Sequence, residues 1–183
     1  MSSISELVAI MKKPFYILTL LLFSLPTFAQ TDSNRIVKIR KIVEQINMDS
    51  VYTTMILDNK QFLEHMTDGG GQLIGYFKNG KLVKIVETVY LSSCINVTEY
   101  YIQSNKLIFV YTFGKEFQYI DSSATFNSNS QSVTMECRFY FDNGKMIKSI
   151  LKGSTRCGGQ PDISWATDYM NECSRYKTLL QKK

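Results

Sequence analysis

Apolar and polar positions alternate around a short phrase that the chain repeats three times, in residues 76–83, 101–108 and 140–147. Each copy runs from a tyrosine through Asn-Gly, or Ser-Asn in the second copy, into a lysine and further apolar residues. Asn-Gly tolerates the positive φ angles of a type I′ turn, and Ser-Asn is a weaker version of it, so each copy predicts a β-hairpin. The turn also sets which residues face each other across the strands. The apolar pairs expected beside the three tips are Phe77–Leu82, Ile102–Leu107 and Phe141–Met146.

The alternation extends each phrase into a longer hairpin, with predicted limits at residues 72–90, 98–113 and 133–151. Residues 107–111 are apolar at odd and even positions alike, which predicts a central strand with material packed on both faces. In the third hairpin the apolar positions alternate with polar ones, so one face should be core and the other solvated. Its apolar positions are Met135, Cys137, Phe139 and Phe141, and Glu136 and Arg138 lie between them.

Two connecting segments have clear patterns of their own. Residues 51–57 are rich in β-formers and predict a strand, which residues 58–60 end as a turn. Residues 122–132 consist mostly of Ser, Thr and Asn. This composition predicts a solvated loop.

Helical spacing appears at both ends of the chain. Ile36, Ile39 and Val43 recur at helical intervals and predict an amphipathic helix over residues 32–47, with Asp32 or Ser33 as its N-cap. Its basic side is expected to be a solvated face. A second helix is predicted over residues 164–180. Its apolar face would contain Trp165, Tyr169, Cys173, Tyr176 and Leu180.

These elements predict an α+β fold. An antiparallel β-meander of about six to eight strands would pack against the N-terminal amphipathic helix and the C-terminal helix. With 183 residues and 44% hydrophobic content, the chain suffices for one such domain with a real core.

The first 29 residues are typical of a secretory signal peptide. Lys12 and Lys13 precede an apolar run at 16–25, and residues 27–29 form a small-x-small-like cleavage site. The pattern predicts a mature domain of residues 30–183, in the periplasm or secreted. Met11 is the expected start, because residues 1–10 add nothing that a signal peptide requires.

A stable membrane anchor is not expected. The apolar run is shorter than the roughly 18–20 residues of a membrane-spanning helix. Gln30, and not a lipid-accepting cysteine, follows the cleavage site. The net charge of +5 is interspersed along the chain, which favours solubility over a nucleic-acid-binding face.

Four cysteines remain after the predicted cleavage, and an even number in an exported chain favours two disulfides. Their spacing includes no CxxC, which argues against a redox pair or a zinc site. Cys157 and Cys173 bracket an irregular stretch, so we expect that pair, and with it Cys94–Cys137. Four cysteines allow three pairings, and the sequence leaves the other two open.

Catalytic chemistry has few candidate residues in this chain. His65 is its one histidine, which excludes a multi-histidine metal centre, and we predict no metal site and no cofactor. Paired carboxylates remain possible for a glycoside hydrolase. The candidates are Asp68, Glu87, Glu99 and Glu136.

Aromatic residues suggest a binding face instead. Tyr90, Tyr100, Tyr101 and Tyr140 could line an exposed surface that stacks on sugars or receives a partner protein. The alternative is that these tyrosines pack at the edge of the core with their hydroxyls at water.

Three runs of sequence resemble a group of exported bacterial proteins of unknown function. These are residues 68–77, then 99–101 leading to 106–111, then 138–145. The chain is similar, more loosely, to MORN-type hairpin repeats, although the regular glycines of those repeats are absent. The resemblance implies a hairpin meander and export, and it implies no activity.

The function predicted from these features is that of an exported, non-catalytic binding protein. It would engage another protein of the cell envelope, or outside the cell, through its sheet face or hairpin loops, for example as an inhibitor or immunity factor. Two alternatives stay open. One is a cell-wall or polysaccharide hydrolase that uses paired carboxylates, and the other is a carbohydrate-binding module.

Overall fold

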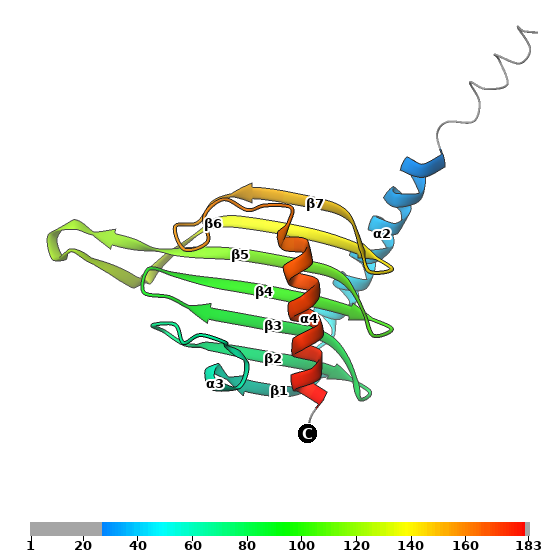
Figure 1. Ribbon diagram of the computed structural model, residues 1–183, viewed down its shortest axis with the longest axis horizontal. Helices are drawn as coiled ribbons and strands as arrows, with labels where there is room; N and C mark the ends of the chain where they lie inside the picture. Colours follow the sequence, from blue (N-terminus) through cyan, green and yellow to red (C-terminus); the bar gives the residue numbers. More distant parts are fainter. Residues whose placement is uncertain (1–26, 182–183) are drawn as a thin grey trace, which may run out of the picture. The chain divides into compact units, whose positions relative to one another are not determined.

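The computed structural model of the protein describes residues 27–181, which form one sheet of seven strands with helices before and after it (Figure 1). Lys38–Lys183 make up one compact unit, to which the last turns of the first helix belong. The elements are α2 (Thr27–Met48), β1 (Thr53–Asp58), α3 (Asn59–Phe62), β2 (Gly71–Lys78), β3 (Lys81–Tyr90), β4 (Cys94–Gln103), β5 (Lys106–Ile120), η1 (Asp121–Ser123), β6 (Thr125–Asp142), β7 (Lys145–Gly153) and α4 (Trp165–Gln181).

The sheet is an antiparallel meander in which the strands follow one another in chain order from β1 to β7. This confirms the predicted fold class, with a helix at each end of the sheet-forming region. Among the described residues, no helix is long and apolar enough to cross a membrane.

The three hairpin tips have the predicted geometry. Both central residues of each turn adopt positive φ, including Asn79 at 51° and Gly80 at 71°, as a type I′ turn requires. The three expected facing pairs are all present. Each hairpin also has a one-residue bulge on its return strand, at Val83, Ile108 and Ile147, so the repeated phrase produces the same local structure three times.

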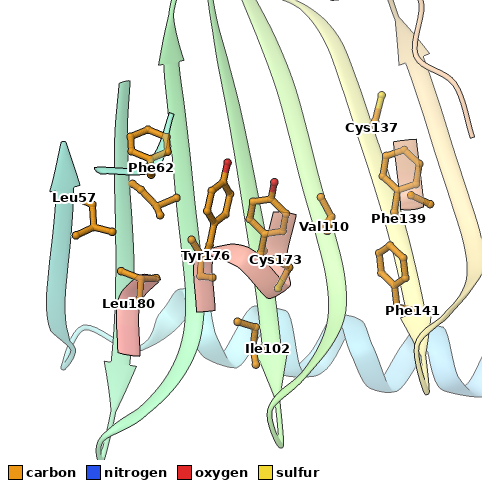
Figure 2. Packing of buried hydrophobic residues seen from close by; sticks show 14 of the residues in the cluster. Leu57, Phe62, Ile102, Val110, Cys137, Phe139, Phe141, Cys173, Tyr176 and Leu180 are labelled. Atoms are coloured by element: carbon orange, nitrogen blue, oxygen red, sulfur yellow. The ribbon is translucent and has the colours of Figure 1, made fainter. Parts of the chain in front are cut away.

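Two helices cover opposite faces of the sheet. α4 lies across one face (Figure 1), where Cys173, Tyr176 and Leu180 point into the core (Figure 2). Residues 38–48 of α2 lie on the other face, where Arg40 Nε donates a hydrogen bond to the Tyr140 hydroxyl at 3.2 Å. The central strand β5 is therefore buried on both sides, as predicted. The core beneath α4 consists of Leu57, Phe62, Leu73, Ile85, Tyr100, Ile102, Val110, Met135, Cys137, Phe139, Phe141, Ala166, Cys173, Tyr176 and Leu180.

The last turn of α4 packs over a glycine of the sheet. A Cβ placed on Gly75 of β2 would lie 2.9 Å from Leu180 Cδ1. That distance is shorter than a van der Waals contact, so the last turn of α4 reaches its position because this strand residue has no side chain. The predicted C-terminal helix and its apolar face are confirmed.

The N-terminal helix is longer than predicted. It begins at Thr27 rather than at residue 32, so Asp32 and Ser33 lie inside it and do not cap it. Residues 27–31 contain neither Gly nor Pro, and a nucleated helix propagates readily into such a stretch. The predicted signal peptide lies outside the described residues up to residue 26, so its cleavage, and the division at residue 30, stay predictions.

The predicted loop at residues 122–132 is wrong. β5 and β6 continue as a two-stranded arm, joined by η1 and by Ala124 at a φ of 49°. The rings of Tyr119 and Phe126 pack across the arm, with centroids 5.1 Å apart. A ribbon with solvent on both faces has no need of alternating apolar residues, so its polar composition is compatible with a strand. Residues 59–62 likewise form the short helix α3, where a turn was predicted over 58–60.

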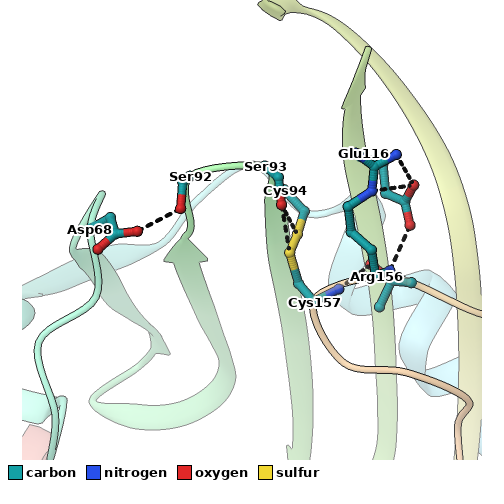
Figure 3. The surroundings of a disulfide bond; sticks show 8 residues. Asp68, Ser92, Ser93, Cys94, Glu116, Arg156 and Cys157 are labelled. Atoms are coloured by element: carbon teal, nitrogen blue, oxygen red, sulfur yellow. Dashed lines mark hydrogen bonds and ion pairs between the residues drawn. A yellow bond between two sulfur atoms is a disulfide. The ribbon is translucent and has the colours of Figure 1, made fainter. Parts of the chain in front are cut away.

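The predicted disulfide pairing is also wrong. Cys94, at the start of β4, is bonded to Cys157 in the loop after β7 (Figure 3). Cys137 and Cys173 are free and buried. The prediction considered only the irregular stretch between Cys157 and α4. The meander instead brings that loop to the sheet, where Glu116 accepts hydrogen bonds from Arg156 N at 2.7 Å and Arg156 Nε at 3.1 Å.

Candidate binding groove

A groove of about 890 Å³ lies between residues 38–48 of α2 and strands β4–β7. The helix supplies Val43 and Met48 as an apolar wall, and Met48 is 78% exposed. The sheet supplies the floor, because alternate residues of neighbouring strands lie side by side on this face. The groove is therefore open to solvent and mostly apolar.

Three aromatic rings form a row across the groove floor. Tyr101, Phe109 and Tyr140 are cross-strand neighbours on β4, β5 and β6. Their ring centroids are 5.6 Å and 4.8 Å apart. All three side chains are buried, and Arg40 and Lys84 lie over the rings of Tyr140 and Tyr101, so the row supports the floor and offers no open stacking surface.

Glu99 lies at one end of the groove and is held by several partners. Lys84 Nζ lies 3.1 Å from Glu99 Oε1, and the Tyr101 hydroxyl donates to Glu99 Oε2 at 2.5 Å. Asn47 of α2 reaches the same cluster, with its Oδ1 3.1 Å from Lys84 Nζ. Burial raises the pKa of Tyr101, and its hydrogen bond to Glu99 raises it further, so the hydroxyl stays a donor at neutral pH.

A second tyrosine–carboxylate pair lies on β5 and β6. The Tyr111 hydroxyl donates to Glu136 Oε1 at 2.5 Å, and the Arg138 guanidinium lies 5.0 Å from the Tyr111 ring centroid. Burial, followed by the hydrogen bond to Glu136, raises the pKa of Tyr111 to about 12. Glu99 and Glu136 thus each accept a hydrogen bond from a tyrosine hydroxyl.

Beyond the groove, the same sheet face carries a row of apolar side chains that we call the open face. It comprises Ile56, Ile74, Val86, Val97 and Phe113, from β1 to β5. Ile56 is 52% exposed and the other four are partly exposed. Val86 lies opposite Glu99 and Val97 opposite Thr88, so polar side chains interrupt the row between β3 and β4. Apolar side chains that remain within reach of solvent are typical of an interaction site.

The four tyrosines predicted to bind a partner do not form one surface. Tyr100 is fully buried in the core under α4, so it cannot belong to an exposed face. Tyr101 and Tyr140 lie on the opposite face, in the groove floor. Tyr90 lies on that face too, at the end of β3, and is 39% exposed. A binding role for these three stays a prediction.

The candidate carboxylates are separated as well. Asp68 accepts a hydrogen bond from Ser92 Oγ at 2.5 Å in a loop (Figure 3). Glu87 points to the α4 face, whereas Glu99 and Glu136 point to the groove face and are separated by β5. His65 is exposed in the loop after α3. Among the described residues, no group of three or more His, Cys, Asp and Glu side chains is arranged to hold a metal ion.

Several groove residues were not singled out from the sequence. Arg40, Phe109 and Tyr111 line the groove together with Arg138 and Lys152. Period-2 alternation already placed Arg138 on the non-core face of its strand. Residues 107–111 predicted that material packs on both faces of their strand, but no local pattern indicated which strands α2 would cover, so the groove itself was not predictable.

No protein-family model matches the chain, and comparison with curated proteins and with solved structures likewise found no match. The resemblance to exported hairpin-meander proteins therefore stays a prediction.

Proposed function

We propose that this protein is an exported, non-catalytic binding protein that engages a partner protein through the open face and the adjoining groove. The observation that carries the proposal is the exposed apolar row on one face of the sheet. A row that crosses five strands is flat and extended, which suits a protein surface better than a small ligand.

The charges of the groove indicate the chemistry of the partner. Arg40, Arg138 and Lys152 line it, against Glu44 and Glu99. Glu99 is paired with Lys84 and Arg138 with Glu136, and both of these partners lie outside the groove lining, which leaves Arg40 and Lys152 against Glu44. We therefore expect the partner to present apolar side chains flanked by acidic groups. Complementary charge at the rim would favour association and orientation more than affinity.

Export is supported by the Cys94–Cys157 bridge, because disulfides persist in oxidising compartments such as the periplasm. The predicted signal peptide is consistent with this location. A periplasmic or secreted inhibitor or immunity factor remains our preferred description.

A variant-dependent capture experiment tests the proposal. Immobilised protein is exposed to envelope extract, and the bound proteins are compared between wild type and Ile56→Lys by mass spectrometry. Ile163→Lys is the matched control, because Ile163 is 55% exposed, close to the 52% of Ile56, but lies in the loop before α4.

We expect one stoichiometric protein to be retained by wild type and by Ile163→Lys and to be lost with Ile56→Lys. Lys152→Glu should weaken its capture and reduce its salt dependence. Equal capture by all variants would contradict the proposal. Recovery of glycan, shortened on incubation, would favour the hydrolase alternative, and recovery of intact glycan would favour a carbohydrate-binding module.

A further inference from the structure

A second pocket, of about 330 Å³, lies on the α4 face of the sheet, away from the groove. Strands β3–β6 form its floor, the first turns of α4 form one wall, and the loop that carries Cys157 forms another. A cavity of this volume corresponds to roughly ten water molecules, which is enough for a small organic ligand.

The pocket is lined by buried hydrogen-bond acceptors. Glu87 presents its carboxyl group, which already accepts hydrogen bonds from Tyr176 OH at 2.5 Å and Tyr100 OH at 3.3 Å. Asn96 contributes a side-chain oxygen that is buried and has no hydrogen-bond partner within the described part of the chain. A buried acceptor without a donor is costly, and a ligand that donates hydrogen bonds would satisfy it.

Two buried threonines add to this acceptor character. The Thr112 hydroxyl donates to the Val97 carbonyl at 3.1 Å, so the 3.0 Å contact between the two hydroxyls has Thr98 as its donor. Both hydroxyl protons are therefore used inside the protein. Thr98 lines the pocket, so its hydroxyl oxygen is a further candidate acceptor.

The charge of the lining points to a cation. Glu87 is joined by Asp168 at the mouth, and the lining includes no lysine, arginine or histidine among the described residues. Trp165 and Tyr169 stand beside these carboxyl groups, and aromatic faces attract cations. Arg175 lies near Glu87 but is not among the lining residues, so a neutral polyol would satisfy the acceptors and leave the pocket itself without a positive charge.

We propose that this pocket binds a small primary ammonium ion, whose N–H groups are received by Glu87, Asn96 and Thr98, while Trp165 and Tyr169 pack against its alkyl part and Asp168 adds negative charge at the mouth. Burial raises the pKa of Glu87, and a bound ammonium would reverse that effect by favouring the ionised carboxylate. The site is separate from the groove and does not depend on the function proposed for it.

NMR titration of the purified protein, with its disulfide intact, tests this site. The probe is n-butylammonium chloride. Tetramethylammonium has the same charge without N–H donors, and 1-butanol has the same chain length without charge. We expect saturable shifts at Asn96, Thr98 and the Trp165 indole with butylammonium. Binding of the other two compounds should be weaker by about tenfold or more.

Variants separate a ligand contact from a general electrostatic effect. Glu87→Gln should weaken butylammonium binding about tenfold, and Asp168→Asn, at an exposed position where folding is not at risk, should weaken it by a smaller factor. Asp121→Asn is the control. That exposed residue lies in η1, at the tip of the arm, and its loss should change binding by less than about threefold.

Three results would overturn the proposal. They are equal binding of 1-butanol, unchanged binding by Glu87→Gln together with Asp168→Asn, and shifts at the same residues with glucose but not with butylammonium. The last result would identify the pocket as a polyol site.

Discussion

Glu87 is a carboxyl group that the fold largely removes from water. It lies between Tyr100 and Tyr176, with Glu172 and Arg175 of α4 nearby. Burial raises its pKa above the ordinary value, mainly because the ionised form loses hydration, although the Tyr176 hydrogen bond partly offsets this. The protonated form of Glu87 is therefore more favoured in the folded state than in the unfolded chain.

The sign of the pH effect follows from this shift. A carboxyl group with a raised pKa in the folded state stabilises the fold below its unfolded pKa, and this contribution is lost as pH rises through the folded pKa. Glu87→Gln removes the titration and, at acidic pH, costs about 1 kcal/mol for one mismatched hydrogen bond. The free energy of unfolding of Glu87→Gln should therefore increase relative to that of the wild type as pH rises.

Urea unfolding between about pH 4 and pH 8 measures this effect. Tyr176→Phe serves as the opposite case, because loss of the donated hydrogen bond should raise the pKa of Glu87 further and make stability fall more steeply with pH. Parallel profiles for wild type and both variants would contradict the assignment.

Among the secondary-structure elements, the second hairpin has the turn whose residues are least suited to positive φ. Ser104 and Asn105 both adopt positive φ, at 49° and 63°, where the other two tips have glycine in the second place. Asn105→Gly should stabilise the protein by about 0.5–1 kcal/mol, since the strain of a side chain at positive φ is removed. The backbone carbonyl of Asn105 can still accept the hydrogen bond from Lys177.

Thermal unfolding compares this variant with the reverse substitution, Gly80→Asn, at the tip of the first hairpin. Gly80→Asn places a side chain at a φ of 71°, where a Cβ meets no atom within 4 Å, so its cost would come from the backbone alone. We expect Tm to rise with Asn105→Gly and to fall with Gly80→Asn. A fall in both would show that another contact governs the Ser104–Asn105 turn.

The contact between β2 and α4 allows a second prediction at this scale. Gly75→Ala should destabilise the protein by about 1–3 kcal/mol, because the new methyl group meets Leu180 at 2.9 Å. Leu180→Ala should cost about 2–5 kcal/mol by leaving a cavity. The double variant should cost less than the sum of the two, since each change relieves the other.

Chemical denaturation of the four proteins gives the coupling energy. Additive effects would mean that α4 shifts away from the sheet instead of packing over Gly75.

At the scale of the whole molecule, the Cys94–Cys157 bridge ties the loop before α4 to the start of β4, across a sequence separation of 63 residues. Closing a loop of this size is worth about 4 kcal/mol in the chain-entropy description. The double variant Cys94→Ser/Cys157→Ser should lose stability of this order.

Alkylation under non-reducing, denaturing conditions checks the pairing directly. Peptide mapping should find alkyl groups on Cys137 and Cys173, and a cross-linked peptide that joins Cys94 to Cys157. Cys137→Ala is the control, because it should leave the cross-linked peptide unchanged. A peptide that joins Cys94 to Cys137 would contradict the structure.

The features of this protein that depend only on neighbouring residues could be predicted from its sequence. Asn-Gly and Ser-Asn tips set the three hairpin registers, because turn geometry is local. Period-3.6 and period-2 patterns located both helices and the core face of β6. The same period-2 rule implies that Tyr100 and Tyr101, as consecutive residues of β4, cannot share a face.

The features that depend on contacts between distant segments became known only from the three-dimensional structure. Cys94 and Cys157 meet because the meander returns the chain to β4, and four cysteines in a sequence permit three pairings. Both pockets arise where a helix lies over a sheet face, so their residues come from the ends of the chain and its middle. The local pattern predicts which side chains point away from the core face. The residues that these side chains contact depend on how distant elements pack.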